Sequence, residues 1–189
     1  MRCFIFLGIF LLGSALKAEA PPEINASRLA GTWRYDPERS TELSSWGTLK
    51  LTIAVNGPRV TLTRAYTAGR RTFQEVTAID LSRQVNLVPI EWWPDNRHLG
   101  AYVGGDKTKT IRTRLRDDGR LLRLSADFVL ATQQGEHAVN ILTDYKVSVN
   151  GSQLTMIELR STRNDPIVYV FKRVTDLAAD AAADKGRAE

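Results

Sequence analysis

The sequence predicts an all-β domain, an antiparallel barrel or sandwich of about nine or ten strands. Three dipeptide turn signals, Asn56-Gly57, Asp118-Gly119 and Asn150-Gly151, each lie between runs of alternating apolar and polar residues. The strand-like segments follow one another at even spacing, and no internal segment shows the apolar period of an amphipathic helix. Residues 21–175 are therefore expected to form one domain, without an internal repeat.

The first turn signal predicts a hairpin in which the dipeptide itself forms the turn. In that register Ile53 lies opposite Val60 and Leu51 lies opposite Leu62. All four side chains then face the core. A slip of one residue would turn the whole apolar set toward water, so the facing of these strands should be firmly fixed.

The second and third turn signals predict two further hairpins by the same reasoning. The second places Leu115 opposite Leu122, and the third places Tyr145 opposite Met156. On the first strand of the second hairpin, the residues between the apolar positions are mostly arginines.

Three more strands are expected at residues 70–80, 84–90 and 167–174. The last of them begins directly after Pro166, and the missing N–H of proline suits the start of a strand. In the first of them the alternation allows two inward-facing sets, one with Phe73 and Ile79 and one with Val76 and Ala78.

The N-terminal residues 1–20 have the three parts of a secretory signal peptide: a basic start, an apolar stretch and an Ala-x-Ala end. Cys3, the only cysteine, lies in this segment, so the mature domain is expected to fold without a disulfide. These features predict a periplasmic or secreted protein. Residues 176–189 are rich in alanine and are expected to form a short helix or a disordered tail.

The opening of the domain, Gly31-Thr32-Trp33, resembles the first-strand Gly-x-Trp motif of lipocalins and related calycin barrels. The resemblance extends over most of residues 28–175 and is closest to secreted bacterial lipocalin-like proteins. It implies a single antiparallel up-and-down β-barrel. It also implies that Trp33 fills the closed end, that the last-strand Arg173 packs across its ring, and that the open end holds a small ligand. Thr143-Asp144-Tyr145 resembles a second lipocalin motif, but it lies inside its predicted strand rather than at the start.

The ligand is expected to enter beside the long irregular segment 91–106, which is rich in aromatic residues. The alternative is that these aromatic side chains cap the barrel mouth as packing. The predicted ligand contacts are Trp92, Trp93, Tyr102, Tyr145, Met156, Arg64 and Arg160. Arg64, at the end of its strand, or Arg160 could meet an acidic head group. Because Glu158 and Arg160 fall on the apolar face, they are expected to pair inside the barrel or to mark its polar mouth.

The favoured function is non-enzymatic binding of a small apolar or amphipathic ligand. The formal net charge of +5 would suit an anionic group on that ligand. His98 and His137 have no cysteine or acidic cluster at metal-ligand spacing, so no metal site is predicted. No nucleotide-binding or nucleophile motif is present in the sequence, so no cofactor is predicted.

Two other functions remain open. The first is a binding module whose outer face holds an anionic polymer or a membrane surface through Arg112, Arg114, Arg116 and Arg123. The alternative interpretation is that these arginines form an ordinary solvated sheet face without a binding function. The second is a hydrolase or isomerase in the barrel mouth, which no motif supports. Nucleic acid is not an expected partner, because the arginines are not interleaved with exposed aromatic residues. The sequence leaves the oligomeric state open.

Overall fold

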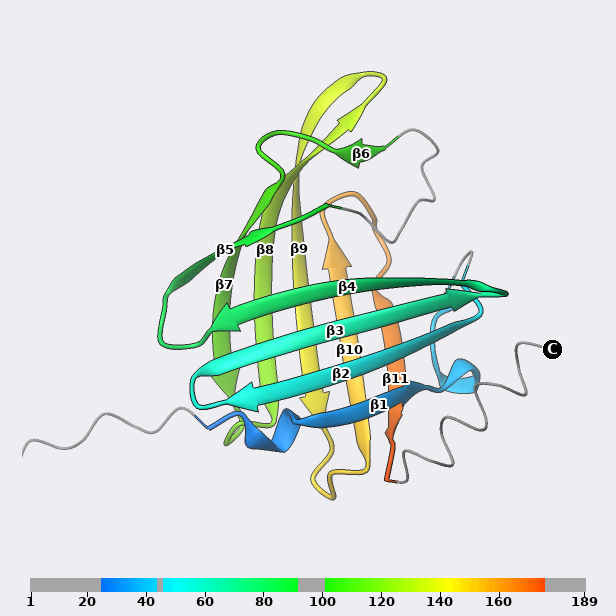
Figure 1. Ribbon diagram of the computed structural model, residues 1–189, viewed down its shortest axis with the longest axis vertical. Coiled ribbons are helices and arrows are strands. Elements are labelled where there is room, and N and C mark those ends of the chain that lie inside the picture. The colour runs from blue at the N-terminus through cyan, green and yellow to red at the C-terminus, as the bar shows by residue number, and fades with distance from the viewer. Residues whose placement is uncertain (1–24, 44–45, 92–100, 176–189) are drawn as a thin grey trace, which may run out of the picture.

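The computed structural model describes residues 25–43, 46–91 and 101–175, and these form one antiparallel sheet that curves into a nearly closed barrel (Figure 1). The predicted all-β barrel is confirmed. The strands are β1 (Gly31–Tyr35), β2 (Thr48–Asn56), β3 (Arg59–Ala68), β4 (Arg71–Asp80), β5 (Val85–Pro89), β6 (Tyr102–Val103), β7 (Thr108–Arg116), β8 (Leu121–Thr132), β9 (Gly135–Val147), β10 (Gln153–Arg160) and β11 (Ile167–Arg173). Two single-turn 3-10 helices, η1 (Ser27–Leu29) and η2 (Pro37–Arg39), flank β1.

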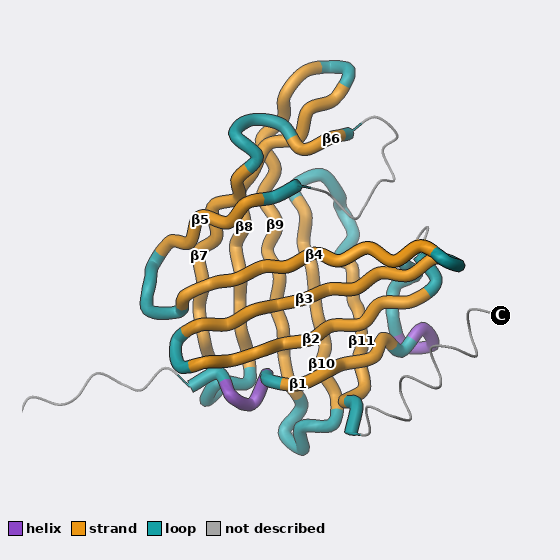
Figure 2. Tube along the Cα trace, in the orientation of Figure 1, coloured by secondary structure: helices purple, strands orange, loops and turns teal. Residues whose placement is uncertain are grey.

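The strand order is β4-β3-β2-β1-β11-β10-β9-β8-β7-β5, with β6 paired to β8 alone. Ten strands therefore form the wall, and most neighbours in the sequence are also neighbours in the sheet, as in an up-and-down barrel. The ladder between β1 and β11 joins the first strand to the last. Figure 2 shows β1–β4 crossing in front of β7–β10. Among the described residues no backbone ladder joins the two edge strands, β4 and β5.

The second and third hairpins have the predicted registers. Leu115 lies opposite Leu122 in β7 and β8, and Tyr145 lies opposite Met156 in β9 and β10. The alternation of apolar residues was sufficient to predict these registers, because each face of the strands is either clearly buried or clearly polar.

The predicted register of the first hairpin is wrong by two residues. Ile53 lies opposite Leu62, and Asn56 remains in the strand, opposite Arg59. The turn consists of Gly57 and Pro58. Gly57 takes a positive φ of 55°, as expected at the first central position of a two-residue hairpin turn. The fixed φ of proline suits the next position, where no N–H is needed. Because the shift is an even number, the predicted inward faces are unchanged.

The same hairpin is longer than predicted, which changes the position of Arg64. Strand β3 continues to Ala68, so Arg64 lies in the middle of the strand and not at its end. In β4, Phe73 and Ile79 belong to the inward set, and Val76 faces outward with 54% of its surface exposed. The segment predicted to be irregular contains the short strand β6.

Trp33 closes the lower end of the barrel and is fully buried. Its indole Nε1 donates a hydrogen bond to the Leu29 carbonyl of η1 at 3.1 Å. The guanidinium of Arg173 lies over the indole ring, with Cζ at 4.0 Å from the ring centroid. Gly31 has φ +142°, and a Cβ placed there would lie 2.5 Å from Nη1 of Arg173. The predicted packing of Arg173 on Trp33 is therefore confirmed, and it requires glycine at position 31.

Candidate functional site

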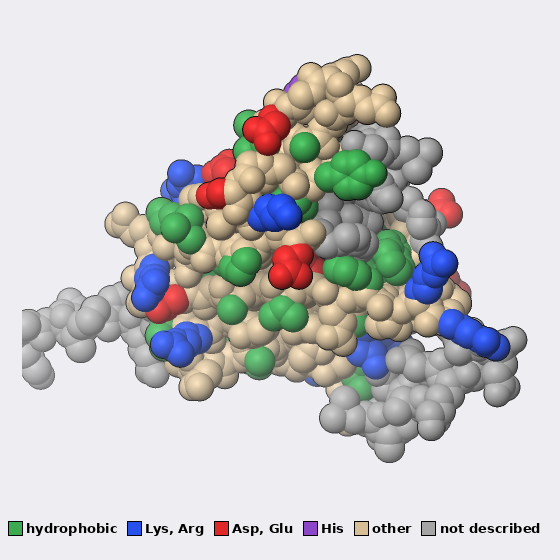
Figure 3. Space-filling view, turned by 45° about the horizontal axis from the view of Figure 1, so that its top comes forward, with side chains coloured by type: hydrophobic (Ala, Val, Ile, Leu, Met, Phe, Trp, Pro, Cys, Tyr) green, Lys and Arg blue, Asp and Glu red, His purple; other side chains and the backbone are tan. Residues whose placement is uncertain are grey.

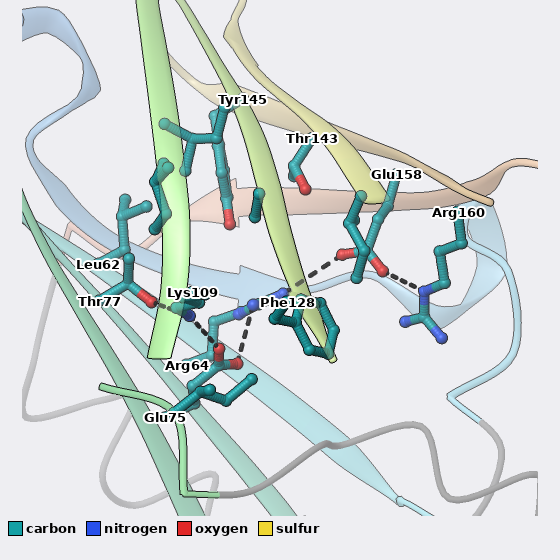
Figure 4. A pocket seen from close by; sticks show the side chains of 15 residues that line it. Leu62, Arg64, Glu75, Thr77, Lys109, Phe128, Thr143, Tyr145, Glu158 and Arg160 are labelled. Carbon is teal, nitrogen blue, oxygen red and sulfur yellow. Dashed lines mark hydrogen bonds and ion pairs between the residues drawn. The ribbon is translucent and has the colours of Figure 1, made fainter. Parts of the chain in front are cut away.

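Five charged side chains from four strands meet inside the barrel (Figure 4). They occupy inward positions that the alternation would otherwise give to apolar residues. The contributing residues are Arg64 of β3, Glu75 of β4, Lys109 of β7, and Glu158 and Arg160 of β10. We call this group the internal charge cluster. Its side chains are between 4% and 15% exposed, so the group is nearly withdrawn from water.

The two carboxylates of the cluster each bridge two cations. Glu75 lies 2.8 Å from Nη2 of Arg64 and 2.9 Å from Nζ of Lys109. Glu158 lies 3.5 Å from Nη1 of Arg64 and pairs through its other oxygen with Nε of Arg160. Arg64 is therefore the centre of a continuous chain of ion pairs. The predicted pairing of Glu158 with Arg160 inside the barrel is confirmed.

Ion pairing outweighs burial in setting the charge of these groups. Burial alone would raise the pKa of Glu75, but Arg64 and Lys109 hold that pKa below its ordinary value. Burial alone would lower the pKa of Arg64, but nearby carboxylates, Glu75 first among them, raise it well above the ordinary value. Glu75 and Arg64 therefore both stay in their charged forms inside the barrel.

Two tyrosines lie next to Arg64 of the cluster. Burial raises the pKa of Tyr145 to about 12, although Arg64 opposes the change. Burial also raises the pKa of Tyr66. Both hydroxyl groups therefore keep their protons at neutral pH. Tyr145 lines the internal cavity, where a protonated hydroxyl can donate a hydrogen bond to an anion.

The cluster faces a small cavity of about 60 Å³. The polar residues of its lining are the cluster together with Thr77, Thr143 and Tyr145. The apolar residues of its lining are Leu62, Ile90, Ile111, Leu124, Ala126, Phe128 and Ile141. Mostly apolar walls with a few placed polar groups are typical of small-molecule sites. By volume the cavity has room for a few water molecules or for the head of a small ligand.

Three of the predicted ligand contacts, Arg64, Tyr145 and Arg160, line the cavity together. Met156 is fully buried but is not part of the cavity wall. Tyr102 belongs to β6, which pairs with β8; its side chain is 71% exposed and is not part of the cavity wall. The other two predicted contacts, Trp92 and Trp93, lie outside the described residues.

Sequence reasoning missed Glu75 and Lys109. The signal for both was the two-residue period of their strands. Glu75 follows Phe73 by two residues, and Lys109 precedes Ile111 by two, so each shares the inward face of its neighbour. A nearly buried charge on such a face needs partners, and here the two residues are partners of one another.

The outer arginines lie on the opposite face of their hairpin, as predicted, and acids are interleaved with them. Arg112 pairs with Asp127 at 2.6 Å, and Arg123 makes two hydrogen bonds to Asp144, at 2.7 and 2.6 Å. Hydrogen bonding to that carboxylate raises the pKa of Arg123. Two of the four arginines are thus neutralised locally, which weakens the field that this face can offer to an anionic surface.

Within the described ranges, no group of three or more histidine, cysteine, aspartate or glutamate side chains is arranged to hold a metal ion. The same residues contain no helix of the length and apolar character needed to span a membrane.

The chain is similar in fold to a mutant of the REP1-NXSQ fatty acid transporter, a solved structure. The two sequences are 13% identical, and the alignment covers 77% of this chain and 98% of the other, with a TM-score of 0.40. No protein-family description matches the chain, and no curated protein sequence matches it.

Proposed function

We propose that this protein binds a small amphipathic acid inside the barrel, without catalysing a reaction. The observation that carries the proposal is that Arg64, Arg160 and Tyr145 line one internal cavity together with apolar side chains. Guanidinium and hydroxyl groups donate hydrogen bonds to an acid, and the apolar side chains suit the carbons attached to it.

The arrangement of polar groups fits a carboxylate or a similar head group. Arg64 and Arg160 offer guanidinium N–H groups, which suit the two oxygens of a carboxylate. Tyr145 adds a hydroxyl donor from a neighbouring strand. The apolar lining of the same cavity, which includes Leu124 and Phe128, then contacts the first carbons of the ligand.

Calorimetric titration with decanoic acid and with its amide tests the proposal. The acid should bind with roughly tenfold or higher affinity than the amide, because only the acid offers a charged acceptor to the guanidinium groups. Arg160→Met should remove most of this difference. Arg114→Met is the matched control, because it deletes an exposed arginine from the outer face and should leave both affinities unchanged.

Circular-dichroism melts establish that each variant is folded before titration. Equal affinity for acid and amide in the wild type would refute an acid site. Saturable binding of neither compound, nor of an apolar dye, would refute ligand binding in the barrel as a whole.

We also propose that the protein is an exported lipocalin-like barrel that reaches the periplasm or the exterior of a bacterial cell. The support is the signal-like order of residues 1–20 and the Gly31-x-Trp33 motif with Arg173. N-terminal sequencing of the protein from its own source should find the chain starting at Pro21. A chain that still starts at Met1 would argue against export by this route.

A further inference from the structure

Both ends of the barrel are filled by the protein's own side chains. At the lower end Trp33 packs beneath η1. At the upper end, among the described residues, a second apolar cluster occupies the interior between β5, β8 and β9; its buried members are Ile90, Phe128, Leu130 and Val139. A ligand bound for the internal cavity would have to displace this packing, or pass through the wall instead.

Among the described residues the wall has no backbone ladder between the edge strands β4 and β5, and we call this gap the opening. At one end the side chain of Asn86 holds the two strands together: its Oδ1 accepts from the Asp80 N–H at 2.7 Å, and its Nδ2 donates to the Asp80 carbonyl at 3.2 Å. Beyond this link β5 diverges from β4 (Figure 1). The strands there leave a surface hollow of about 270 Å³, lined by Phe73, Gln74, Glu75, Val76, Pro89, Ile90, Glu91 and Lys109.

This hollow and the internal cavity have one wall in common. Glu75, Ile90 and Lys109 line both. Lys109 reaches across the opening from β7, and its Nζ lies 2.9 Å from both Glu75 and Thr77 of β4. The two spaces are therefore separated by side chains and not by a hydrogen-bonded backbone. Passage between the two spaces therefore requires side chains to move, but it does not require a backbone ladder to break.

The cavity volume makes this opening relevant to ligand binding. The internal cavity, about 60 Å³, has room for a head group but not for a long apolar body. The hollow beside it is more than four times as large and includes the apolar side chains of Phe73, Val76 and Ile90. Figure 3 shows hydrophobic side chains in the middle of this face of the molecule, with single acidic and basic side chains among them.

We propose that an amphipathic acid enters the barrel sideways, through the gap between β4 and β5, and that the hollow there holds its apolar body. The proposal rests on the proposed function, since it needs an acid head at Arg64 and Arg160. The occupant is a single-chain monoanionic amphiphile. Its head passes Lys109 to reach the arginines, and its body stays between Phe73 and Ile90.

The charges along this path favour the head-inward orientation. Glu91 at the rim is exposed, so solvent and salt screen its repulsion of an anion. The cations of the internal charge cluster are nearly buried, so solvent and salt screen their attraction for an anion much less. Glu75 keeps its partner Arg64 when Lys109 turns toward the ligand, so passage of the head leaves no carboxylate without a cation.

Filling the hollow tests the proposal without altering the internal charge cluster. Gln74→Trp and Val76→Trp both add bulk at outward-facing positions of β4 that line the hollow. Ala78→Trp is the matched control, because it lies on the same strand and outward face but is not part of the hollow. The probe is dansyl-labelled undecanoic acid, followed by stopped-flow fluorescence. Each variant is first shown by circular dichroism to be folded.

Both filling variants should slow association of the probe by roughly tenfold relative to Ala78→Trp. They should leave the affinity for butyric acid, which fits the inner cavity, near the wild-type value. Association as fast as in the control, with probe binding intact, would overturn the side opening and leave the proposed function standing. Failure of the wild type to bind the probe or butyric acid would overturn both.

Discussion

Removing Trp33 and Arg173 singly and together should show that the closed end of the barrel depends on their direct contact. Trp33→Ala deletes a fully buried indole and leaves a cavity, so it should lower the free energy of unfolding by about 3–5 kcal/mol. Arg173→Ala removes a guanidinium that donates to the carbonyls of Gly151, Ala30 and Arg28. The loss of these hydrogen bonds should cost about 1–3 kcal/mol.

The two effects should not add. The Cζ of Arg173 lies 4.0 Å from the centroid of the Trp33 ring, a distance typical of a cation–π contact worth about 1–2 kcal/mol when it is partly shielded from water. The double variant should therefore lose about 1–2 kcal/mol less than the sum of the single changes.

Urea denaturation followed by circular dichroism measures this coupling. A parallel cycle with Trp33→Leu retains more of the packing, so that the double variant still folds. Strict additivity in both cycles would show that the stacked geometry contributes nothing to stability, and would refute this account of the closed end.

Three further predictions follow from the same contacts. Gly31→Ala should destabilise the protein by about 1–3 kcal/mol through its positive φ and its clash with Arg173, and urea melts should show a smaller loss in the Arg173→Ala background, where only the φ strain remains. The pKa of Glu75 is below its ordinary value of 4.5, so its contribution to stability is present above that value and is lost as pH falls through the lowered pKa; acid titration of the unfolding free energy should be flatter in Glu75→Gln. Met156→Ala should cost about 2–5 kcal/mol in a melt yet leave acid affinity unchanged in folded protein, because its side chain is buried outside the cavity wall, whereas Tyr145→Phe should weaken acid binding.

The fold was predictable because its local signals agree with one another. Asp118-Gly119 and Asn150-Gly151 set two registers correctly, since the strands on either side alternate without interruption. The predicted register of the first hairpin was wrong because Pro58, and not Asn56, is the second turn residue beside Gly57. The dipeptide rule does not consider the residue after glycine.

The site was only partly predictable because it depends on contacts between strands distant in sequence. Arg64 and Arg160 were recognised as cations that could meet an acidic head group. Their link through Glu158 could not be read from the sequence, because β3 and β10 lie on opposite sides of the barrel interior. Glu75 was missed because the alternation in β4 permits either face of the strand to point inward. A charged residue makes the face that carries it less apolar, so the pattern gives no reason to place Glu75 inside.

The opening between β4 and β5 could not be predicted at all. Whether two edge strands form a ladder depends on the curvature of the whole sheet, which no local pattern encodes. No sequence pattern predicts that the side chain of Asn86 makes the two hydrogen bonds to the backbone of Asp80 that a neighbouring strand would otherwise make.

The ionisation of a bound ligand tests the central claim most directly. Decanoic acid labelled with carbon-13 at the carboxyl group reports its own pKa when its chemical shift is followed against pH in the complex. Arg64, at the centre of the internal charge cluster, should hold the pKa of the bound acid below the value of the free acid, because nearby cations favour the charged form. A bound acid whose pKa is raised would show that its carboxyl group lies in apolar surroundings away from these arginines, and would contradict the account.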